Sequence, residues 1–198
     1  MVGNCALQDD ATVHIWPEAN VMARGQGLAR KILAEAAQNV HFSVPMDARC
    51  ATGNNAKNLD YNADRQCRLA IAVAKPTEAV TLSLEESNAR ILLDSGRWAE
   101  VLVPIEDGKR HVIVAGFYGI AGASNDASLY KLNEQLIHWA MLRMLSFGNT
   151  PYILAGDFNI DPAASETIQL AIRSRSRHGR LTEMTSIRHS AGLGSLKV

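Results

Sequence analysis

Residues 151–162 read Pro151-Tyr-Ile-Leu-Ala-Gly-Asp-Phe-Asn-Ile-Asp-Pro162, a short apolar run that is followed by Gly156 and then by an acid and an amide two residues apart. The run predicts a short buried strand. Because side chains alternate along an extended chain, Asp157 and Asn159 lie on the same side at the end of a rigid element. A carboxylate there can take up a proton or hold a cation, and an amide can donate to a developing oxyanion. The other interpretation, an Asx-type turn that simply ends the strand, stays open at this point.

The segments around this motif alternate between strand and helix patterns. A predicted hairpin joins 98–105 to 111–118 through the Asp107-Gly108 turn signal. Asp126 is placed to cap a helix that ends near Gly148. The apolar face predicted for this helix consists of Leu129, Leu132, Leu136, Trp139, Ala140 and Leu145. Further strands are predicted at 11–16 (stopped by Pro17), 40–44, 67–74 and 78–84, and further helices at 26–38 and 165–172. This order favours a layered α/β domain.

Size and charge are those of one ordinary globular domain. The chain has 198 residues and is 47% hydrophobic, which is enough to supply one sizeable core. Twenty basic and twenty acidic side chains balance, which speaks against a strongly basic nucleic-acid coat. We therefore expect a single domain over 1–198, with an exposed loop at 46–66 and a weakly structured basic tail at 173–198.

Cysteine usage and hydropathy indicate the cellular setting. The odd count of three cysteines favours a reducing compartment over a disulfide framework. No apolar run approaches the roughly 20 residues that span a bilayer, and the first ten residues lack the features of a secretory signal. We expect an intracellular protein with no membrane partner, its nuclear or cytoplasmic location and its oligomeric state being left open.

Four segments together resemble the endonuclease/exonuclease/phosphatase superfamily, which has the DNase I-like fold. Gly156-Asp-Phe-Asn159 resembles its signature, and His14-Ile-Trp-Pro-Glu18 resembles the strand that ends in its metal-binding glutamate, with Pro17 in place of the usual Gln. The segment from Cys67 to Pro76 resembles the small-apolar strand after the variable loop of the family, and 111–122 resembles the strand that ends in an active-site aromatic, here Tyr118. The resemblance covers roughly 11–172.

The resemblance implies a Mg²⁺-dependent phosphodiesterase, with Mn²⁺ as a possible substitute, that acts on nucleic acid in the manner of the endonuclease domains of mobile elements. Glu18 would hold the metal, Asp157 would activate the attacking water, Asn159 would orient the phosphate, and Tyr118 would complete the site. A solvated charge at Glu18 and simple packing at Tyr118 are the alternatives for those two residues. Because the implied site is shared, we expect the strands ending at Trp16 and Ala155 to lie side by side near the centre of one sheet.

The sequence departs from the family at its end. Family members close with an Asp-His pair that polarises the scissile phosphate, whereas neither His178 nor His189 is preceded by Ser-Asp. The resemblance therefore implies a DNase I-like domain that is incomplete at the C-terminal end and, because few residues precede the glutamate strand, at the N-terminal end as well. The sequence leaves two functions open: an enzyme of this class, or a degenerate non-catalytic fragment of the same fold that binds nucleic acid or a protein.

Overall fold

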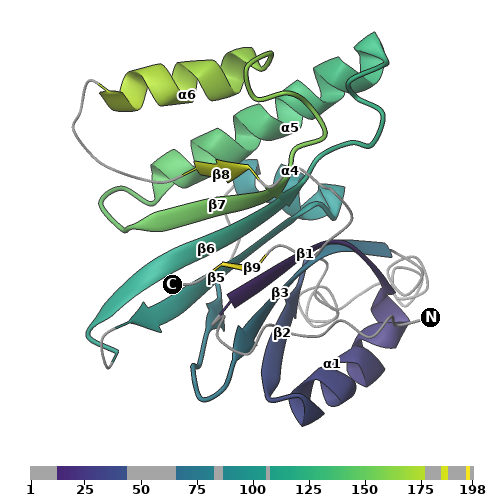
Figure 1. Cartoon of the computed structure of the whole chain (residues 1–198), viewed down its shortest axis with the longest axis vertical. Helices are drawn as coiled ribbons and strands as arrows, with labels where there is room; N and C mark the ends of the chain where they lie inside the picture. Colours follow the sequence, from purple (N-terminus) through teal and green to yellow (C-terminus); the bar gives the residue numbers. More distant parts are fainter. Residues whose placement is uncertain are drawn as a thin grey trace.

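Two β-sheets form the centre of the molecule (Figure 1). The computed structural model describes residues 13–43, 66–82, 87–105, 108–176, 184–186 and 195–196. The small sheet contains, in spatial order, β2 (Gln38–Phe42), β3 (Gln66–Ala74), β1 (Val13–Met22) and β9 (Ser195–Leu196). The large sheet contains β4 (Val80–Thr81), β5 (Trp98–Ile105), β6 (Arg110–Tyr118), β7 (Tyr152–Asp157) and β8 (Met184–Ser186). All neighbours pair antiparallel except β6–β7 and β7–β8, which are parallel.

Helices cover the outer faces of the sheets. The helical elements are η1 (Ala23–Gly25), α1 (Gln26–Glu35), α4 (Ser87–Ser95), α5 (Ala127–Ser146) and α6 (Glu166–Ser176). Helix α1 lies beside the small sheet, whereas α5, with α4 and α6, lies on the large-sheet side of the molecule (Figure 1). The result is a layered α/β sandwich, which confirms the fold class expected from the sequence.

The space between the sheets is filled by branched aliphatic side chains. They come from the inward-facing positions of β1, β3, β5 and β6, and they include Val13, Ile15, Leu69, Ile71, Val73, Val101, Val103, Val112 and Val114. The sheets pack closely at Gly116, where an added Cβ would lie 2.9 Å from Leu69 Cδ2 and 3.1 Å from Ile15 Cγ2. This approach brings the end of β6 against β1, which matters for the site described below.

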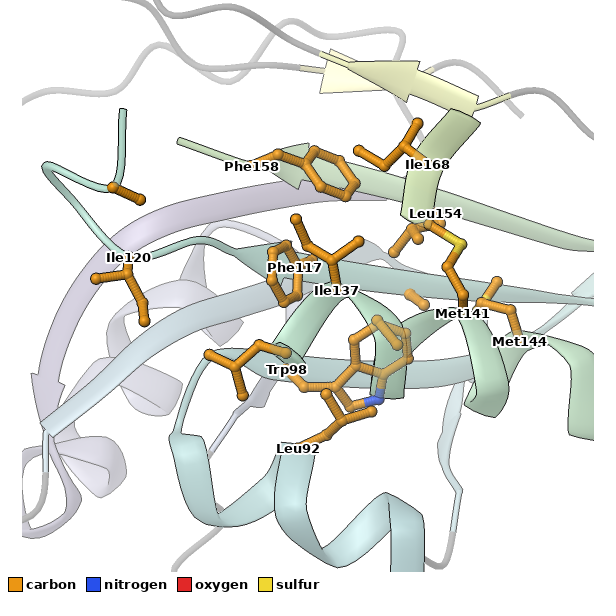
Figure 2. Close-up of a cluster of buried hydrophobic side chains, with 14 residues drawn as sticks. Leu92, Trp98, Phe117, Ile120, Ile137, Met141, Met144, Leu154, Phe158 and Ile168 are labelled. Carbon is orange, nitrogen blue, oxygen red and sulfur yellow. The ribbon is translucent and has the colours of Figure 1, made fainter. Parts of the chain in front are cut away.

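The outer face of the large sheet packs on α5 (Figure 2). Trp98 and Phe117 of the sheet lie in one cluster with Ile137 and Met144 of the helix. The helix begins as predicted, because the Asp126 carboxylate accepts hydrogen bonds from the backbone N–H groups of Ser128 and Leu129.

The apolar face predicted for α5 was partly wrong. Leu132 is 50% exposed and Leu145 is 67% exposed, whereas Asn133, Ile137 and Met144 are buried. Apolar residues occur on two adjacent stripes of this helix, and helical spacing alone does not say which stripe meets the sheet. Packing against Trp98 and Phe117 decides it.

The prediction that Pro17 ends the first strand was wrong. Strand β1 continues to Met22, and its pairing with β3 shifts between Pro17, opposite Leu69, and Val21, opposite Cys67. Proline lacks an N–H but is tolerated at a bulge. Three residues therefore bulge out of the ladder, and Glu18 at their start has a φ of 58°.

The prediction that the strands ending at Trp16 and Ala155 lie side by side in one sheet was wrong. Strand β1 pairs with β3 and β9, and β7 pairs with β6 and β8 in the other sheet. Their inward side chains, such as Ile15 and Ala155, instead meet face to face in the same core cluster. A short apolar run is expected both for two neighbouring strands of one sheet and for two strands that face each other from different sheets. The sequence pattern therefore cannot distinguish these two arrangements.

Several other predictions fall partly or wholly outside the described residues. The expected loop lies outside the described residues apart from Gln66, which begins β3. Of the expected tail, the structure describes the end of α6 and the strands β8 and β9. Helix α4 was not predicted, and of the strand predicted over 78–84 the described residues 78–82 form strand only at Val80–Thr81. No helix in the described part of the chain is long and apolar enough to cross a membrane.

Candidate active site

Glu18 and Tyr118 meet where the two sheets come together. The Tyr118 hydroxyl donates a 2.6 Å hydrogen bond to Glu18 Oε1. Tyr118 is the last residue of β6 and is 4% exposed, and the bulge in β1 presents Glu18 to it. Burial, followed by the hydrogen bond to Glu18 and by its negative charge, raises the pKa of Tyr118 to about 12. The phenol therefore keeps its proton at neutral pH and acts as a donor to the carboxylate.

Asp157 lies beside Tyr118 in the sheet. Strands β6 and β7 are parallel with Tyr118 opposite Asp157, so both strands end at the same edge. The charge of Asp157 also contributes to the raised pKa of Tyr118. The preceding Gly156 has a φ of 146°, and a Cβ there would collide with the carbonyl oxygen of Phe117. Glycine is thus required for the close approach that aligns Asp157 with Tyr118.

Asn159 is held in place by two hydrogen bonds. Its backbone N–H donates to Asp157 Oδ1 at 2.9 Å, and its Nδ2 donates to the Gly119 carbonyl at 3.1 Å. The first bond is the Asx-type turn that the sequence left open, so that interpretation is correct for the backbone. The turn also leaves Asp157 Oδ2 for chemistry. Asn159 has a φ of 52°, a left-handed conformation that Asn tolerates better than most residues.

Sequence reasoning missed Asn133, which joins the two loops of the site. This buried residue of α5 accepts a hydrogen bond from the Ile120 N–H at 2.8 Å and donates one to the Phe158 carbonyl at 2.8 Å. At Gly119 a Cβ would collide with the same carbonyl group. The available signal was a polar residue on an otherwise apolar helix face, because a buried amide needs partners.

Sequence reasoning also missed Arg97. Trp98 lies opposite Phe117 in the hairpin, so Arg97 falls opposite Tyr118. Its Nη1 donates to the carbonyls of Tyr118 and Gly119, at 3.3 and 2.6 Å, and its Cζ lies 5.2 Å from the centre of the Tyr118 ring. The predicted hairpin already contained the signal, because its register places the residue before the first strand beside the last residue of the second.

The donors of this cluster fit a hard divalent cation. Glu18 Oε2 and Asp157 Oδ2 have no hydrogen-bond partner in the described part of the chain, since each carboxylate uses its other oxygen. Mg²⁺ is commonly held by one or two carboxylates together with water and substrate phosphate oxygens. Among the described residues no three His, Cys, Asp or Glu side chains gather as a metal-binding group. The described residues of the site therefore offer two carboxylates for a metal whose remaining ligands would be water and substrate.

The histidines that the sequence singled out lie outside the described residues, so the structure does not place His178 or His189. Strand β8, which precedes His189 in the chain, pairs in parallel with β7 and places Ser186 opposite Gly156. The described part of the site therefore consists of the four residues proposed from the sequence, Glu18, Tyr118, Asp157 and Asn159, to which the structure adds Asn133 and Arg97.

Comparison with solved structures supports the fold. The chain is similar to the human Nocturnin catalytic domain with bound sulfate, with a TM-score of 0.51 and 11% identity over 80% of this chain and 54% of that one. It is also similar to ANGEL2, a 2′,3′-cyclic phosphatase (TM-score 0.47, 14% identity, 78% of this chain and 42% of that one). A third match is truncated Caenorhabditis elegans TDP2 (TM-score 0.42, 10% identity, 77% of this chain and 51% of that one).

The chain thus spans about half the length of the structures it matches. No protein-family model and no curated protein matches the sequence. The DNase I-like fold that the sequence motifs implied is confirmed by the structural similarity.

Proposed function

We propose that this protein is a Mg²⁺-dependent phosphodiesterase that acts on nucleic acid, Mn²⁺ being able to replace Mg²⁺. The observation that carries the proposal is the hydrogen bond from the Tyr118 hydroxyl to Glu18. Tyr118 also lies opposite Asp157 in the pairing of β6 with β7. Glu18, Tyr118 and Asp157 come from three distant segments of the chain, yet they meet at one edge of the sandwich. If Glu18 were only a solvated charge and Tyr118 only a packing residue, there would be no reason for the two side chains to form a hydrogen bond.

Each residue has a role that its geometry supports. Glu18 and Asp157 supply oxygens for the metal, which when bound would neutralise negative charge on the phosphoryl oxygens. Asp157, held by the Asn159 N–H through one oxygen, accepts a proton from the attacking water. The Asn159 amide, fixed on the Gly119 carbonyl, orients the phosphate. Tyr118 orients the Glu18 carboxylate by donating a hydrogen bond to it.

The choice of nucleic acid rests on the sequence. The middle of the chain resembles the endonuclease domains of mobile elements, and this resemblance ranks a nucleic-acid strand above lipid or inositol phosphates. The neutral overall charge means that contacts to phosphate must come from local basic side chains and not from a general positive field.

The second candidate is a domain of the same fold that binds nucleic acid or a protein without hydrolysing a substrate. The observation that favours it is the sequence around the two candidate histidines, neither of which follows an acid. Loss of a polarising donor would leave metal binding intact but slow hydrolysis greatly. This second candidate therefore predicts metal binding with weak or no turnover.

A plasmid-nicking assay separates the two candidates. Supercoiled DNA is incubated with the wild-type chain and Mg²⁺ or Mn²⁺, beside Asp157→Ala and a control variant, Asp161→Asn, from the exposed turn that follows. The enzyme hypothesis predicts nicking that Asp157→Ala lowers at least about 100-fold, since general base catalysis typically contributes this much. Asp161→Asn should nick at the wild-type rate. Nicking that survives Asp157→Ala would exclude the assigned site.

Metal binding is tested separately from turnover. Calorimetric titration with Mn²⁺ should show binding to the wild type that Glu18→Gln weakens at least about tenfold, because a carboxylate ligand becomes a neutral amide. Binding without nicking would favour the non-catalytic candidate. Equal Mn²⁺ affinity in wild type and Glu18→Gln would remove Glu18 from the metal site.

A further inference from the structure

A second arginine lies close to Arg97. The register of β1 and β3 places Arg68 opposite the β1 bulge that begins at Glu18, because Pro17 faces Leu69 and Val21 faces Cys67. The Arg68 N–H also donates a 3.3 Å hydrogen bond to the carbonyl of Gly96, the residue before Arg97. The small sheet and the large sheet thus each contribute one arginine to the edge where Glu18 and Tyr118 meet.

The two arginines carry like charges, and no acid among the described residues forms an ion pair with either of them. Both are half-buried. Neither guanidinium lies within ion-pair distance of a carboxylate in the part of the chain that the structure describes. Burial, and after it the positive charge of Arg68, lower the pKa of Arg97. Two half-buried positive charges that repel each other are stabilised when an anion binds between them.

Arg97 keeps donors for such an anion. Its Nη1 is used by the carbonyls of Tyr118 and Gly119, which fixes the plane of the guanidinium over the Tyr118 ring. Nε and Nη2 have no hydrogen-bond partner among the described residues. A guanidinium whose orientation is already fixed loses little freedom on binding, and its paired N–H groups match the oxygens of a phosphate.

We propose that Arg68 and Arg97 form a subsite that binds a second phosphate group of the substrate, next to the phosphate that reacts at Glu18 and Asp157. This inference rests on the proposed function and narrows it. The substrate is then a phosphodiester strand with at least two neighbouring phosphates, and an isolated phosphoester would leave the arginine pair unoccupied. In this arrangement the acids Glu18 and Asp157 bind the metal, and the two arginines bind the neighbouring phosphate.

Equilibrium binding tests this subsite without any turnover. Thymidine dinucleotides that carry a 5′-phosphate, a 3′-phosphate or no terminal phosphate are titrated into the full chain in EDTA and followed by calorimetry. We expect one of the two terminal phosphates to tighten binding by about tenfold, the size of a charge-assisted hydrogen-bond contact. The favoured end also gives the direction in which the strand crosses the site.

The variants are Arg68→Gln, Arg97→Lys and, as the matched control, Arg90→Gln in the exposed part of α4. Arg68→Gln should bind all three dinucleotides with the same affinity, while Arg90→Gln should keep the wild-type preference. Arg97→Lys retains the charge but loses the paired geometry, so the preference should shrink several-fold. Because Arg97 also contacts the backbone, each variant is first compared with the wild type for its melting temperature.

The results separate the subsite from the reaction. A wild-type chain that shows no preference for either terminal phosphate overturns the subsite, as does an Arg68→Gln variant that keeps the preference. Either result leaves the nicking and Mn²⁺ experiments unaffected. A preference that depends on Arg68 in a chain that neither nicks DNA nor binds Mn²⁺ would support the subsite and reject the enzyme.

Discussion

Two arginine clusters border strand β5, and they differ in how their charge is compensated. On the outer face of the large sheet, Arg143 of α5 forms a 2.6 Å ion pair with Glu100, which also accepts a 2.8 Å hydrogen bond from Trp98 Nε1. At the start of the same strand, Arg97 lies near Arg68 with no acid within ion-pair distance in the described residues.

The difference separates a charge pair that holds the fold together from the arginines of the proposed subsite. Arg143 and Glu100 are 8% and 2% exposed, and charges buried this deeply are tolerated only when paired. Arg68 and Arg97 are half-buried at an edge, where water and a ligand can reach them. Among the described residues the repulsion between Arg68 and Arg97 is not compensated, and this is the basis for the proposed anion site, whereas the paired cluster attaches α5 to the sheet.

The largest effect on stability is expected from breaking the paired cluster. Arg143→Met leaves Glu100 buried without its cation, and removal of one partner of such a pair typically costs about 3–5 kcal/mol of the free energy of unfolding. Urea unfolding of Arg143→Met measures this cost. The same change at the edge, Arg68→Met, should alter stability by about 0.5 kcal/mol or less, since it also relieves repulsion.

A double variant checks the reason for that loss. Glu100→Leu combined with Arg143→Met should recover most of the stability, because no charge is then left buried. If the double variant were less stable than Arg143→Met alone, the cost would come from lost packing and not from the orphaned carboxylate.

A smaller loss is expected when the backbone of the site is altered without any change of charge. Gly156→Ala places a Cβ against the Phe117 carbonyl oxygen at a φ of 146°, which should cost about 3 kcal/mol. Gly108 also has a positive φ, of 78°, but open space around it, so Gly108→Ala should cost only about 1 kcal/mol. Thermal unfolding of both variants measures the difference, and equal losses would show that φ alone matters at Gly156.

The smallest effect is expected at the hydrogen bond between Tyr118 and Glu18. The pKa of Tyr118 is raised from 10.0 to about 12, so the folded state holds the phenol proton more tightly than the unfolded state does. The stability gained from this is complete below pH 10 and is lost as the pH rises through 12. Glu18→Gln removes the neighbouring charge and should move the pKa of Tyr118 toward 10, leaving the contribution of burial.

Ultraviolet absorbance titration of the tyrosines measures this change. The matched control is Glu134→Gln, because the charge of Glu134 contributes to a raised pKa at Tyr130 and not at Tyr118. A high-pH tyrosine titration that is the same in Glu18→Gln and in the wild type would contradict the hydrogen bond between Glu18 and Tyr118.

Much of the candidate site could be predicted because it consists of strand ends. Glu18, Tyr118, Asp157 and Asn159 each follow or end an apolar run, and the motifs around them resemble one family. Arg97 and Asn133 were missed for a different reason. Their importance depends on the register of the hairpin and on the face of α5 that packs inward, and neither is visible as a motif.

Local patterns in the sequence were enough to predict most of the alternation of strands and helices, the hairpin of β5 and β6 and the Asp126 cap, and they offered the turn at Asp157 and Asn159 as one of two interpretations. These depend on neighbours in the chain, on side-chain periodicity and on local hydrogen bonds. The three-dimensional packing was needed to show that β1 and β7 face each other from different sheets. It also decided that the β1 bulge brings Glu18 to Tyr118 and Arg68 near Arg97. Such contacts join residues that are far apart in the sequence. An apolar strand can also be buried either between two strands of its own sheet or against the face of another sheet. The packing of the whole core therefore selects among arrangements that local patterns leave equivalent.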